Sequence, residues 1–297
     1  MKQVIDKICF IILNYNSYDM TIQCYKNLKK LDDKIKIIIV DNNSSDDSSD
    51  NFLKLKEPST KILLNKSNLG YAAGNNIGLR YISHNMPEIE VVFIINPDII
   101  IDKIEYIYQL YNELLANNEL ATITSMTIYN GKYYLPNTSC WHFLDKNQVI
   151  LNSSLLGKIF KKNLYYSKLE LNDKIAYVDV IQGCFFGIKM DVIKKINYLD
   201  ERTFLYCEEQ ILGRKIYNAG MKSAVLIDTY IYHNHFEKDK ELMDKKKRIF
   251  HMNCLKNSRK VLLNNYLNLN KFQKVVRNIF LDIDMFIKKI IIISKFF

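Results

Sequence analysis

Short apolar runs alternate with segments of helical spacing through the first hundred residues. The runs are rich in β-branched residues and end at polar turn residues, which is typical of buried strands. The predicted strands are Ile8–Leu13, Ile35–Val40, Ile62–Leu64 and Val91–Ile95, and the predicted helices are Asp19–Leu31 and Tyr71–His84. This alternation predicts βαβ units, and therefore an α/β fold with a mostly parallel central sheet flanked by helices.

The pattern is less regular after residue 101. It predicts helices at Ile104–Leu115, Asp191–Ile196 and Gln210–Ala219, strands at Ala121–Ile128 and Ile175–Ile181, and a close-packed turn at Gly183–Gly187. No linker composition interrupts the chain before about residue 236. We therefore expect one domain over residues 1–236, whose first 101 residues form a nucleotide-binding half by the rule that α/β sheets bind ligands at the carboxyl ends of their strands.

The C-terminal segment carries almost all of the net charge. The chain has a formal charge of +10, and residues 237–297 hold 15 Lys and Arg against 6 Asp and Glu. Apolar residues from Phe272 onward follow a helical stripe, which predicts a basic amphipathic helix. Its most hydrophobic part, residues 285–297, is too short and too lysine-rich to span a bilayer. We expect it to lie on an anionic membrane surface, and the alternative is packing on the main domain or in a homodimer. No nucleic-acid reader motif accompanies the charge.

The cysteines and the N-terminus bear on the compartment. The six cysteines are scattered without CxxC spacing, which disfavours a metal cluster or a disulfide framework and favours free thiols. Residues 1–7 lack a signal-peptide pattern. Together with the basic tail, these features predict a cytoplasmic protein, peripheral on the inner face of the cell membrane.

Asn96-Pro97-Asp98 directly follows the predicted strand Val91–Ile95. Pro97 stiffens the backbone there, so Asp98 is expected at the edge of the sheet where ligands bind. A carboxylate in that position suits a hard divalent cation with a phosphate on its far side. The alternative is that Asp98 opens a turn or caps a helix.

Polar loops follow the first two predicted strands. Asn14-Tyr15-Asn16 ends the first strand, and the run from Asp41 to Asp46 ends the second. Both loops would face one crevice, where their short polar side chains could contact a base or ribose. Two Asx turns are the alternative reading.

The segment from Ser67 to Asn76 has little side-chain bulk at a helix start. Gly70 and Gly74 flank two alanines there, and the helix N-terminus exposes backbone N–H groups that suit a diphosphate or a sugar. Asn68 and Asn75 are candidate polar contacts. The alternative is close packing of the helix on the sheet.

The segment Leu199–Glu209 gathers four carboxylates around an aromatic turn. Glu208 and Glu209 lie at the start of the following helix, where ordinary surface glutamates would complement the helix dipole. They also follow Phe204-Leu205-Tyr206, however, and partial burial would raise the pKa of a glutamate towards that of a useful general base.

Taken together, these segments resemble the family 2 glycosyltransferases, inverting enzymes of the GT-A fold, and most closely the bacterial rhamnosyltransferase-like branch. The resemblance covers residues 8–101 and 181–236. The segments that carry it are IILNYNS, IIIVDNNSSDDS, NKSNLGYAAGNNIGLR, FIINPDI, GCFFGIKMDVIKKI, YLDERTFLYCEEQILGRKIYNAG and IYHNH. It implies a GT-A domain with an acceptor-binding half at residues 102–236, followed by a helical basic extension.

The resemblance also implies roles for individual residues. Asp41 would contact the base of the nucleotide. Asp98 would bind Mn²⁺ or Mg²⁺ as the last residue of a DxD-type motif whose first position is Asn96. Glu209 would be the catalytic base, with Glu208 as the alternative, and His233 or His235 would complete the metal site. The predicted donor-binding residues are Leu13, Asn14, Asn16, Asp41, Asn43, Ser44, Asn68, Gly70, Gly74, Asn75, Asn96 and Asp98. The predicted acceptor-binding residues are Gly183, Cys184, Asp200 and Glu201.

The activity implied is transfer of one sugar from a UDP- or dTDP-sugar to a hydroxyl of a growing, lipid-linked cell-surface glycan. Two alternatives stay open. A nucleotidyltransferase that makes sugar nucleotides would need a glycine-rich basic loop near the N-terminus, which IILNYNS lacks. A non-catalytic basic scaffold or nucleic-acid-binding protein would leave Asp41, Asp98 and Glu209 without a shared purpose.

Overall fold

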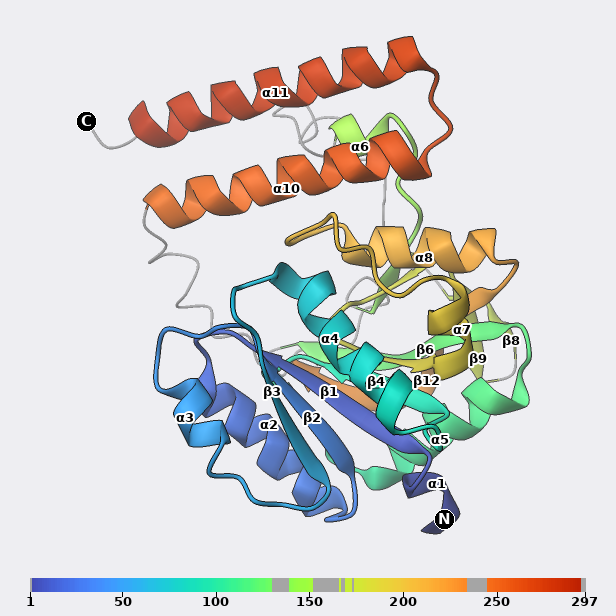
Figure 1. The fold of residues 1–297 in the computed structure, drawn as a ribbon. Helices are drawn as coiled ribbons and strands as arrows, with labels where there is room; N and C mark the ends of the chain where they lie inside the picture. The colour runs from blue at the N-terminus through green and yellow to red at the C-terminus, as the bar shows by residue number, and fades with distance from the viewer. Residues whose placement is uncertain are drawn as a thin grey trace.

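A mixed β-sheet forms the middle layer of the molecule. The computed structural model describes residues 2–129, 139–151, 166, 169–172, 174–233 and 245–294. Within these residues one ten-stranded sheet has the order β3 (Thr60–Leu64), β2 (Lys36–Asp41), β1 (Ile8–Asn14), β4 (Val91–Ile95), β11 (Phe185–Lys189), β6 (Leu120–Tyr129), β12 (Lys222–His233), β9 (Ile175–Val178) and β8 (Leu171–Asn172), and β5 (Ile99–Ile100) pairs with β12. Helices cover both faces of the sheet (Figure 1), which confirms the predicted α/β class.

The first half of the sheet is built as predicted. Strands β3, β2, β1 and β4 are all parallel to one another. The larger helices of the domain are α2 (Tyr18–Leu31), α4 (Gly70–Asn85), α5 (Ile104–Ala116), α7 (Met190–Lys195) and α8 (Glu208–Asn218), and the short ones are α1 (Lys2–Ile5), α3 (Ser48–Phe52) and α6 (Gln148–Leu151). The parallel register brings the ends of β1 and β2 level, since Asn14 is paired with Asp41.

The second half of the sheet differs from the mostly parallel arrangement predicted. Strand β11 lies antiparallel between β4 and β6, and it takes up residues 185–187 of the turn predicted at Gly183–Gly187, so that only residues 183 and 184 form a bend. That prediction is wrong because Gly187 serves cross-strand packing. A Cβ atom there would lie 2.7 Å from Cε1 of Phe93, so the glycine makes room for the ring on the neighbouring strand.

The strand predicted at Ile175–Ile181 is divided at Asp179. Strand β9 pairs with β12, whereas β10 (Val180–Ile181) pairs with β7 (Cys140–Trp141) in a separate two-stranded sheet. The carboxylate of Asp179 accepts a hydrogen bond from the backbone N–H of Phe143 at 3.1 Å, and its own N–H donates to the hydroxyl of Tyr166. These contacts replace ladder hydrogen bonds, so the chain crosses from one sheet to the other.

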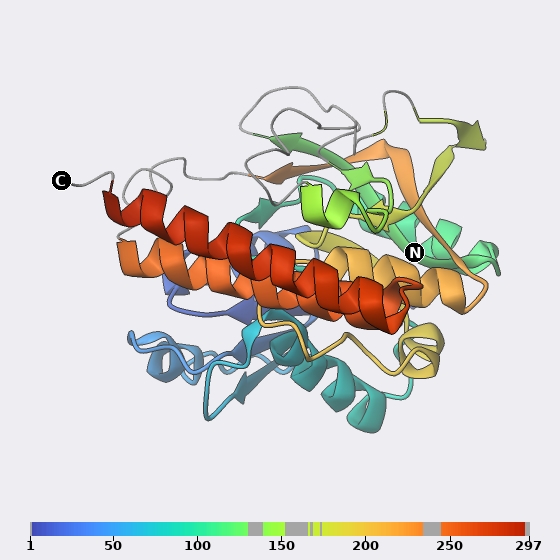
Figure 2. The same cartoon turned by 90° about the horizontal axis from the view of Figure 1, so that it is seen from above.

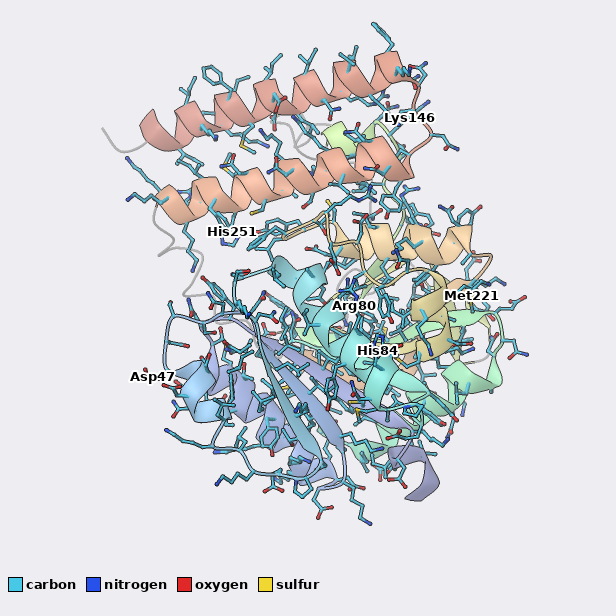
Figure 3. The ribbon with its side chains drawn as sticks, viewed as in Figure 1. Asp47, Arg80, His84, Lys146, Met221 and His251 are labelled. Carbon is cyan, nitrogen blue, oxygen red and sulfur yellow. The ribbon has the colours of Figure 1, made fainter. Side chains whose placement is uncertain are left out.

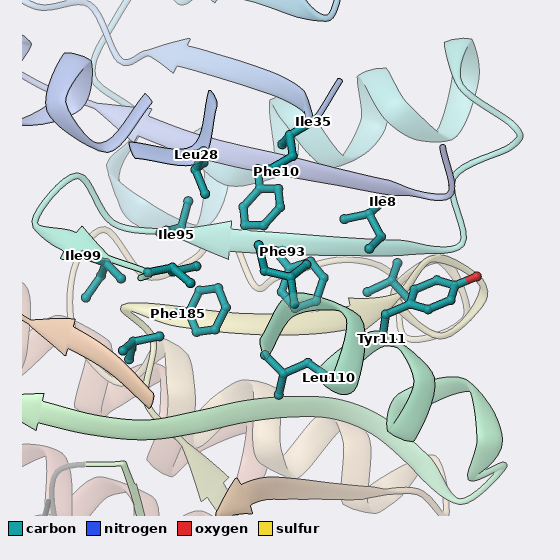
Figure 4. Packing of buried hydrophobic residues seen from close by; sticks show 14 of the residues in the cluster. Ile8, Phe10, Leu28, Ile35, Phe93, Ile95, Ile99, Leu110, Tyr111 and Phe185 are labelled. Atoms are coloured by element: carbon teal, nitrogen blue, oxygen red, sulfur yellow. The ribbon is translucent and has the colours of Figure 1, made fainter. Parts of the chain in front are cut away.

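Two hydrophobic cores lie on opposite faces of the sheet. One core joins the sheet to α2 and α5, and the other joins it to α4, α7 and α8. In the first core the rings of Phe10, Phe93 and Phe185 stack across β1, β4 and β11, with centroids 5.2 and 5.6 Å apart (Figure 4). These buried rings fix the three strands whose ends carry the polar loops.

The C-terminal segment forms a helical hairpin of α10 (Lys245–Tyr266) and α11 (Lys271–Ser294). Figure 2 shows the two helices running side by side over the rest of the molecule. A third small core, which includes Val149, Ile211, Leu262 and Leu281, joins the hairpin to α6 and α8. The predicted amphipathic helix is therefore present as α11, and α10, which we did not predict, packs against the main domain. None of the helices in the described part of the chain is both long and apolar enough to cross a bilayer.

Candidate active site

Asp41 ties together the loops that follow β1 and β2. Its side chain is fully buried and accepts hydrogen bonds from Asn14 Nδ2 at 2.8 Å, from the hydroxyl and N–H of Ser44, and from Ser49 Oγ. Burial acts to raise the pKa of Asp41, but these hydrogen bonds outweigh it and lower the pKa below its usual value. All four acceptor positions of the carboxylate are used, so direct contact with a base requires a serine hydroxyl to turn away.

The rim of this pocket is exposed. Asn16 and Asn43 both adopt left-handed backbone conformations, with φ of 51° and 62°, and both residues are exposed. The N–H of Asn16 donates to Ser44 Oγ at 2.9 Å, which joins the two loops at their tips. The structure therefore brings Asn14, Asn16, Asp41, Asn43 and Ser44 together at one edge of the sheet, as predicted.

Asn42 is a connecting residue that the sequence reasoning missed. Its side chain donates to Asn68 Oδ1 at 2.9 Å and to the carbonyl of Gly70, and it accepts from Asn65 and from the N–H of Leu69. Asn42 thus fixes the loop before α4 against the end of β2. The burial of Asn42, which makes each of its donors and acceptors need a partner, follows from the packing of these loops and has no signal in the sequence.

Gly74 and Asn75 serve the packing of α4. A Cβ atom on Gly74 would lie 2.6 Å from Cδ1 of Leu13, so this glycine lets the helix approach β1 closely. Asn75 is fully buried and donates to the carbonyl of Tyr71 at 3.0 Å. These contacts fit the alternative given in the sequence analysis, in which this segment lets the helix pack closely on the sheet.

Gly70 joins the start of α4 to the loop before α8. Its φ is +80°, and a Cβ atom there would lie 2.3 Å from the carbonyl oxygen of Phe204. The same carbonyl accepts a hydrogen bond from the N–H of Tyr71 at 2.9 Å. The absence of a side chain at Gly70 is therefore required for the contact between these two distant segments.

Gly70→Ala should lower the free energy of unfolding by about 2 kcal/mol or more, because the left-handed backbone costs about 1–2 kcal/mol and the backbone clash adds to it. Gly220→Ala is the matched control, since Gly220 has a φ of +74° and nothing within 4 Å of its Cβ position. Chemical denaturation measures both variants. Equal losses would show that the contact with Phe204 is not tight.

Asp98 and His233 meet at the other end of the site. Strand β5 pairs antiparallel with the end of β12, and this places His233 opposite Ile99. The His233 Nε2 atom lies 3.0 Å from Asp98 Oδ2, and both side chains are largely buried, at 14% and 17% exposed. The structure thus brings these two predicted metal ligands together, whereas His235 lies outside the described residues.

A cavity of about 620 Å³ opens beside this pair. Asn96 and His233 line one part of it, and Glu208 and Glu209 line another. Its other lining residues are Tyr71, Tyr129, Trp141, Gln182, Gly183, Cys184, Leu205, Tyr206 and Cys207. The predicted acceptor residues Gly183 and Cys184 are therefore placed in the same cavity as the predicted base, and the aromatic rings beside them suit a sugar face.

Glu208 and Glu209 form the first turn of α8 inside the cavity wall. Burial, together with the negative charge of Glu209, raises the pKa of Glu208 to about 8. Burial also raises the pKa of Glu209, against hydrogen bonds from the backbone N–H groups of Glu209 and Gly183. These are not ordinary surface glutamates at a helix start, because desolvation dominates their environment.

Gly183 determines where the Glu209 carboxylate lies. A Cβ atom on Gly183 would lie 2.8 Å from Glu209 Oε1, so only glycine leaves room for the carboxylate. The Gly183 carbonyl accepts a hydrogen bond from the Tyr71 hydroxyl at 2.5 Å. The carboxylate is therefore held between α4 and the start of β11.

Asp200 and Glu201 lie outside the cavity. Asp200 accepts hydrogen bonds from Arg202 and from the Tyr266 hydroxyl, and these outweigh burial and lower the pKa of Asp200 to about 2. Glu201 pairs with Arg80 of α4 and accepts a hydrogen bond from Asn76. Figure 3 labels Arg80 on this helix. Both residues hold the loop before α8 to α4 and α10, and their acceptor role stays a prediction.

Helix α10 completes the support of that loop. Ser258 Oγ donates to the carbonyl of Leu205 at 2.7 Å, and the Tyr206 hydroxyl lies 2.9 Å from His251 Nδ1 (Figure 3). Tyr206 and Cys207 have positive φ values of 75° and 66°. A strained turn that lines a cavity needs such external contacts, so the hairpin is part of the scaffold of the site.

Comparisons with known proteins show the family and the fold of the chain. The family model described as "Glycosyl transferase family 2" matches residues 9–196. No curated protein sequence matches the chain.

Three solved structures show the same fold at low identity. They are GalNAc-T7 with UDP, GalNAc and Mn²⁺ (15% identity, TM-score 0.61, 86% of this chain and 47% of that one), the mannosyltransferase PcManGT of Pyrobaculum calidifontis with GDP-Man and Mn²⁺ (13%, 0.57, 97% and 73%), and S. aureus TarS with UDP-GlcNAc (17%, 0.52, 92% and 70%). This chain thus spans about half of GalNAc-T7. The GT-A fold predicted from the sequence is confirmed, and the chain belongs to glycosyl transferase family 2.

Proposed function

We propose that this glycosyltransferase moves one sugar from a nucleoside-diphosphate donor to an acceptor hydroxyl with inversion at the anomeric carbon. The observation that carries the proposal is that Glu209 and His233 line the same cavity. His233 also contacts Asp98, so this pair of candidate metal ligands lies beside that cavity. A general base thus lies across one cavity from the groups suited to a diphosphate. A single displacement needs these two functions and no covalent nucleophile.

Asp98 and His233 fit a divalent cation by their chemistry. A carboxylate oxygen and an imidazole nitrogen suit Mn²⁺ or Mg²⁺ when diphosphate oxygens and waters supply the other ligands. No group of three or more His, Cys, Asp or Glu side chains that could hold a metal occurs within the described ranges, so the donor would have to complete the site. When bound, the metal supplies charge neutralisation at the leaving diphosphate. Mn²⁺ accompanies two of the similar structures.

The side chains of this chain carry the remaining steps. Glu209 takes the proton from the acceptor hydroxyl, which attacks the anomeric carbon from the face opposite the diphosphate. Gly183 and Tyr71 hold the carboxylate in place. Tyr129 and Trp141 line the same cavity and exclude water around the sugar.

The donor would extend from the cavity towards the loops after β1 and β2. Asp41 organises these loops, and Asn14, Asn16, Asn43 and Ser44 surround it. The resemblance to the rhamnosyltransferase-like branch favours a UDP- or dTDP-sugar as donor and a hydroxyl of a growing cell-surface glycan as acceptor. The similar structures bear UDP, UDP-GlcNAc or GDP-Man.

A panel of UDP-, dTDP- and GDP-sugars tests this function. One donor should bind in the presence of Mn²⁺ and lose its sugar slowly to water, with release of the nucleoside diphosphate. A second set of reactions offers sugar 1-phosphates with nucleoside triphosphates. Pyrophosphate release there, without donor hydrolysis in the first set, would contradict the proposal and favour a nucleotidyltransferase.

Transfer should also depend on pH in a defined direction. A carboxylate accepts a proton only when it is ionised, and burial raises the pKa of Glu209 above its usual value. The rate at saturating metal should therefore fall as the pH is lowered, with a midpoint above the ordinary pKa of 4.5. A midpoint at the ordinary value would show that the base is solvated.

A further inference from the structure

The outer face of α11 is an exposed apolar surface, which we call the α11 outer face. Phe272 is 76% exposed, Phe286 is 65% exposed and Ile283 is 53% exposed. The complete set comprises Phe272, Val275, Val276, Ile279, Phe280, Ile283, Phe286, Ile287 and Ile290. At 100° per residue these side chains occupy one continuous sector of the helix, and an apolar surface of this extent marks an interaction site.

The opposite face of α11 is already in use. Leu281, Met285 and Ile292 are buried, and Leu281 belongs to the small core that joins the hairpin to α6 and α8. Arg277 donates to the carbonyl of Lys146 and to Asn147 Oδ1. The helix is therefore seated by its inner face, and the α11 outer face is turned away from the molecule, as the outermost layer in Figure 1 shows.

The charge of the described residues around this surface is mostly positive. Residues 245–294 contain twelve Lys and Arg against two Asp. Both aspartates are paired, Asp282 with Lys256 and Lys260, and Asp284 with Lys288. Lys246, Lys247 and Arg248 at the start of α10 are exposed. The hairpin thus presents a strong positive field next to an apolar face.

We propose that the α11 outer face lies in the interface of an anionic lipid bilayer, with the helix parallel to the membrane plane. Apolar side chains would enter the headgroup–acyl boundary, and the basic residues would meet anionic headgroups. The same charge argues against a second copy of this chain as the occupant. Two such surfaces pressed together would bring like charges into register, whereas an anionic membrane is complementary to them.

This placement has a consequence for the cavity. Helix α10 contacts Leu205 and Tyr206, which line the cavity that holds Glu208 and Glu209. A bilayer under α11 would therefore lie one helix layer from the loop that supports the proposed base. That position suits an acceptor carried on a lipid. This consequence rests on the proposed function, whereas the proposal of membrane binding does not depend on it.

The test is flotation of the full chain with vesicles of phosphatidylglycerol and phosphatidylcholine, compared with phosphatidylcholine alone. The chain should bind the anionic vesicles, and binding should weaken when salt is raised to about 0.5 M. Ile279→Gln with Ile283→Gln keeps the charge and removes apolar area from the outer face. It should weaken binding by about 10-fold or more. Leu53→Gln is the matched control. Leu53 is 56% exposed at the end of α3, away from α11, and this variant should bind the vesicles as well as the unaltered chain does.

Three results would overturn the proposal. They are failure of the unaltered chain to bind anionic vesicles at low salt, unchanged binding of the double variant, and a dimer by light scattering that the double variant dissociates. The last would assign the α11 outer face to a second copy. Far-UV circular dichroism checks the fold of the double variant. Phe286→Gln alone provides the same comparison if that variant does not fold.

Discussion

Glu209→Gln should reduce sugar transfer by about 100- to 10,000-fold and leave donor affinity almost unchanged. Gln keeps the shape of the side chain and its contact with Gly183, but it cannot accept the proton of the acceptor hydroxyl. A positioned general base contributes about this much to the rate. In the proposed mechanism, donor binding depends on other groups, namely the Asp41 loops and the Asp98–His233 pair, so donor affinity is measured on the same variant.

Glu208→Gln is the matched control for this experiment. Glu208 lies in the same cavity wall, and burial raises its pKa to about 8. A carboxyl whose pKa is higher in the folded state than in the unfolded state destabilises the fold once the pH rises above the unfolded value. Glu208→Gln should therefore be at least as stable as the unaltered chain near pH 8. If it alone abolishes transfer, Glu208 is the base, and if both variants work normally the mechanism is wrong.

The parallel half of the fold could be predicted because its signals are local. Val91–Ile95 is buried along its whole length and matches strand β4 residue for residue. The strand ends that carry Asn14, Asp41 and Asp98 follow from the same pattern, since parallel strands deliver their carboxyl ends to one edge. The predicted donor loops and the predicted base were placed in the crevice by this rule and by the family resemblance together.

Helix α10 was missed because its pattern is not amphipathic. Its buried positions are Cys254, Ser258, Leu262 and Leu263, and lysines and asparagines occur around the rest of the helix. A helix of this kind is stabilised by tertiary contacts that no local period reveals. The same limit applies to Asp200. The family resemblance implied an acceptor role for it, but its hydrogen-bond partner Tyr266 lies 66 residues away in the chain.

The contact between Asp98 and His233 was implied by the family resemblance and has no signal in the local pattern of the sequence. The two residues are 135 positions apart, and they meet only because the two-residue strand β5 pairs with the end of β12. A strand this short has no periodicity to detect. The pairing matters for function, because it turns two isolated side chains into a pair of candidate ligands at the edge of the sheet.

Asp98→Ala should lower transfer by about 100-fold or more, because the leaving diphosphate would lose its main electrostatic stabilisation. Asp102→Ala is the matched control, since Asp102 is an exposed carboxylate four residues further on and should leave activity unchanged. Calorimetry measures the affinity for Mn²⁺ with and without nucleoside diphosphate, and it separates loss of metal binding from misfolding of the variant. The Asp98 variant should lose metal affinity while its melting temperature stays close to that of the control. Full activity of the unaltered chain in excess chelator would contradict the role assigned to Asp98 and His233. The diphosphate would then have to be stabilised by a helix N-terminus and by hydrogen-bond donors of the protein.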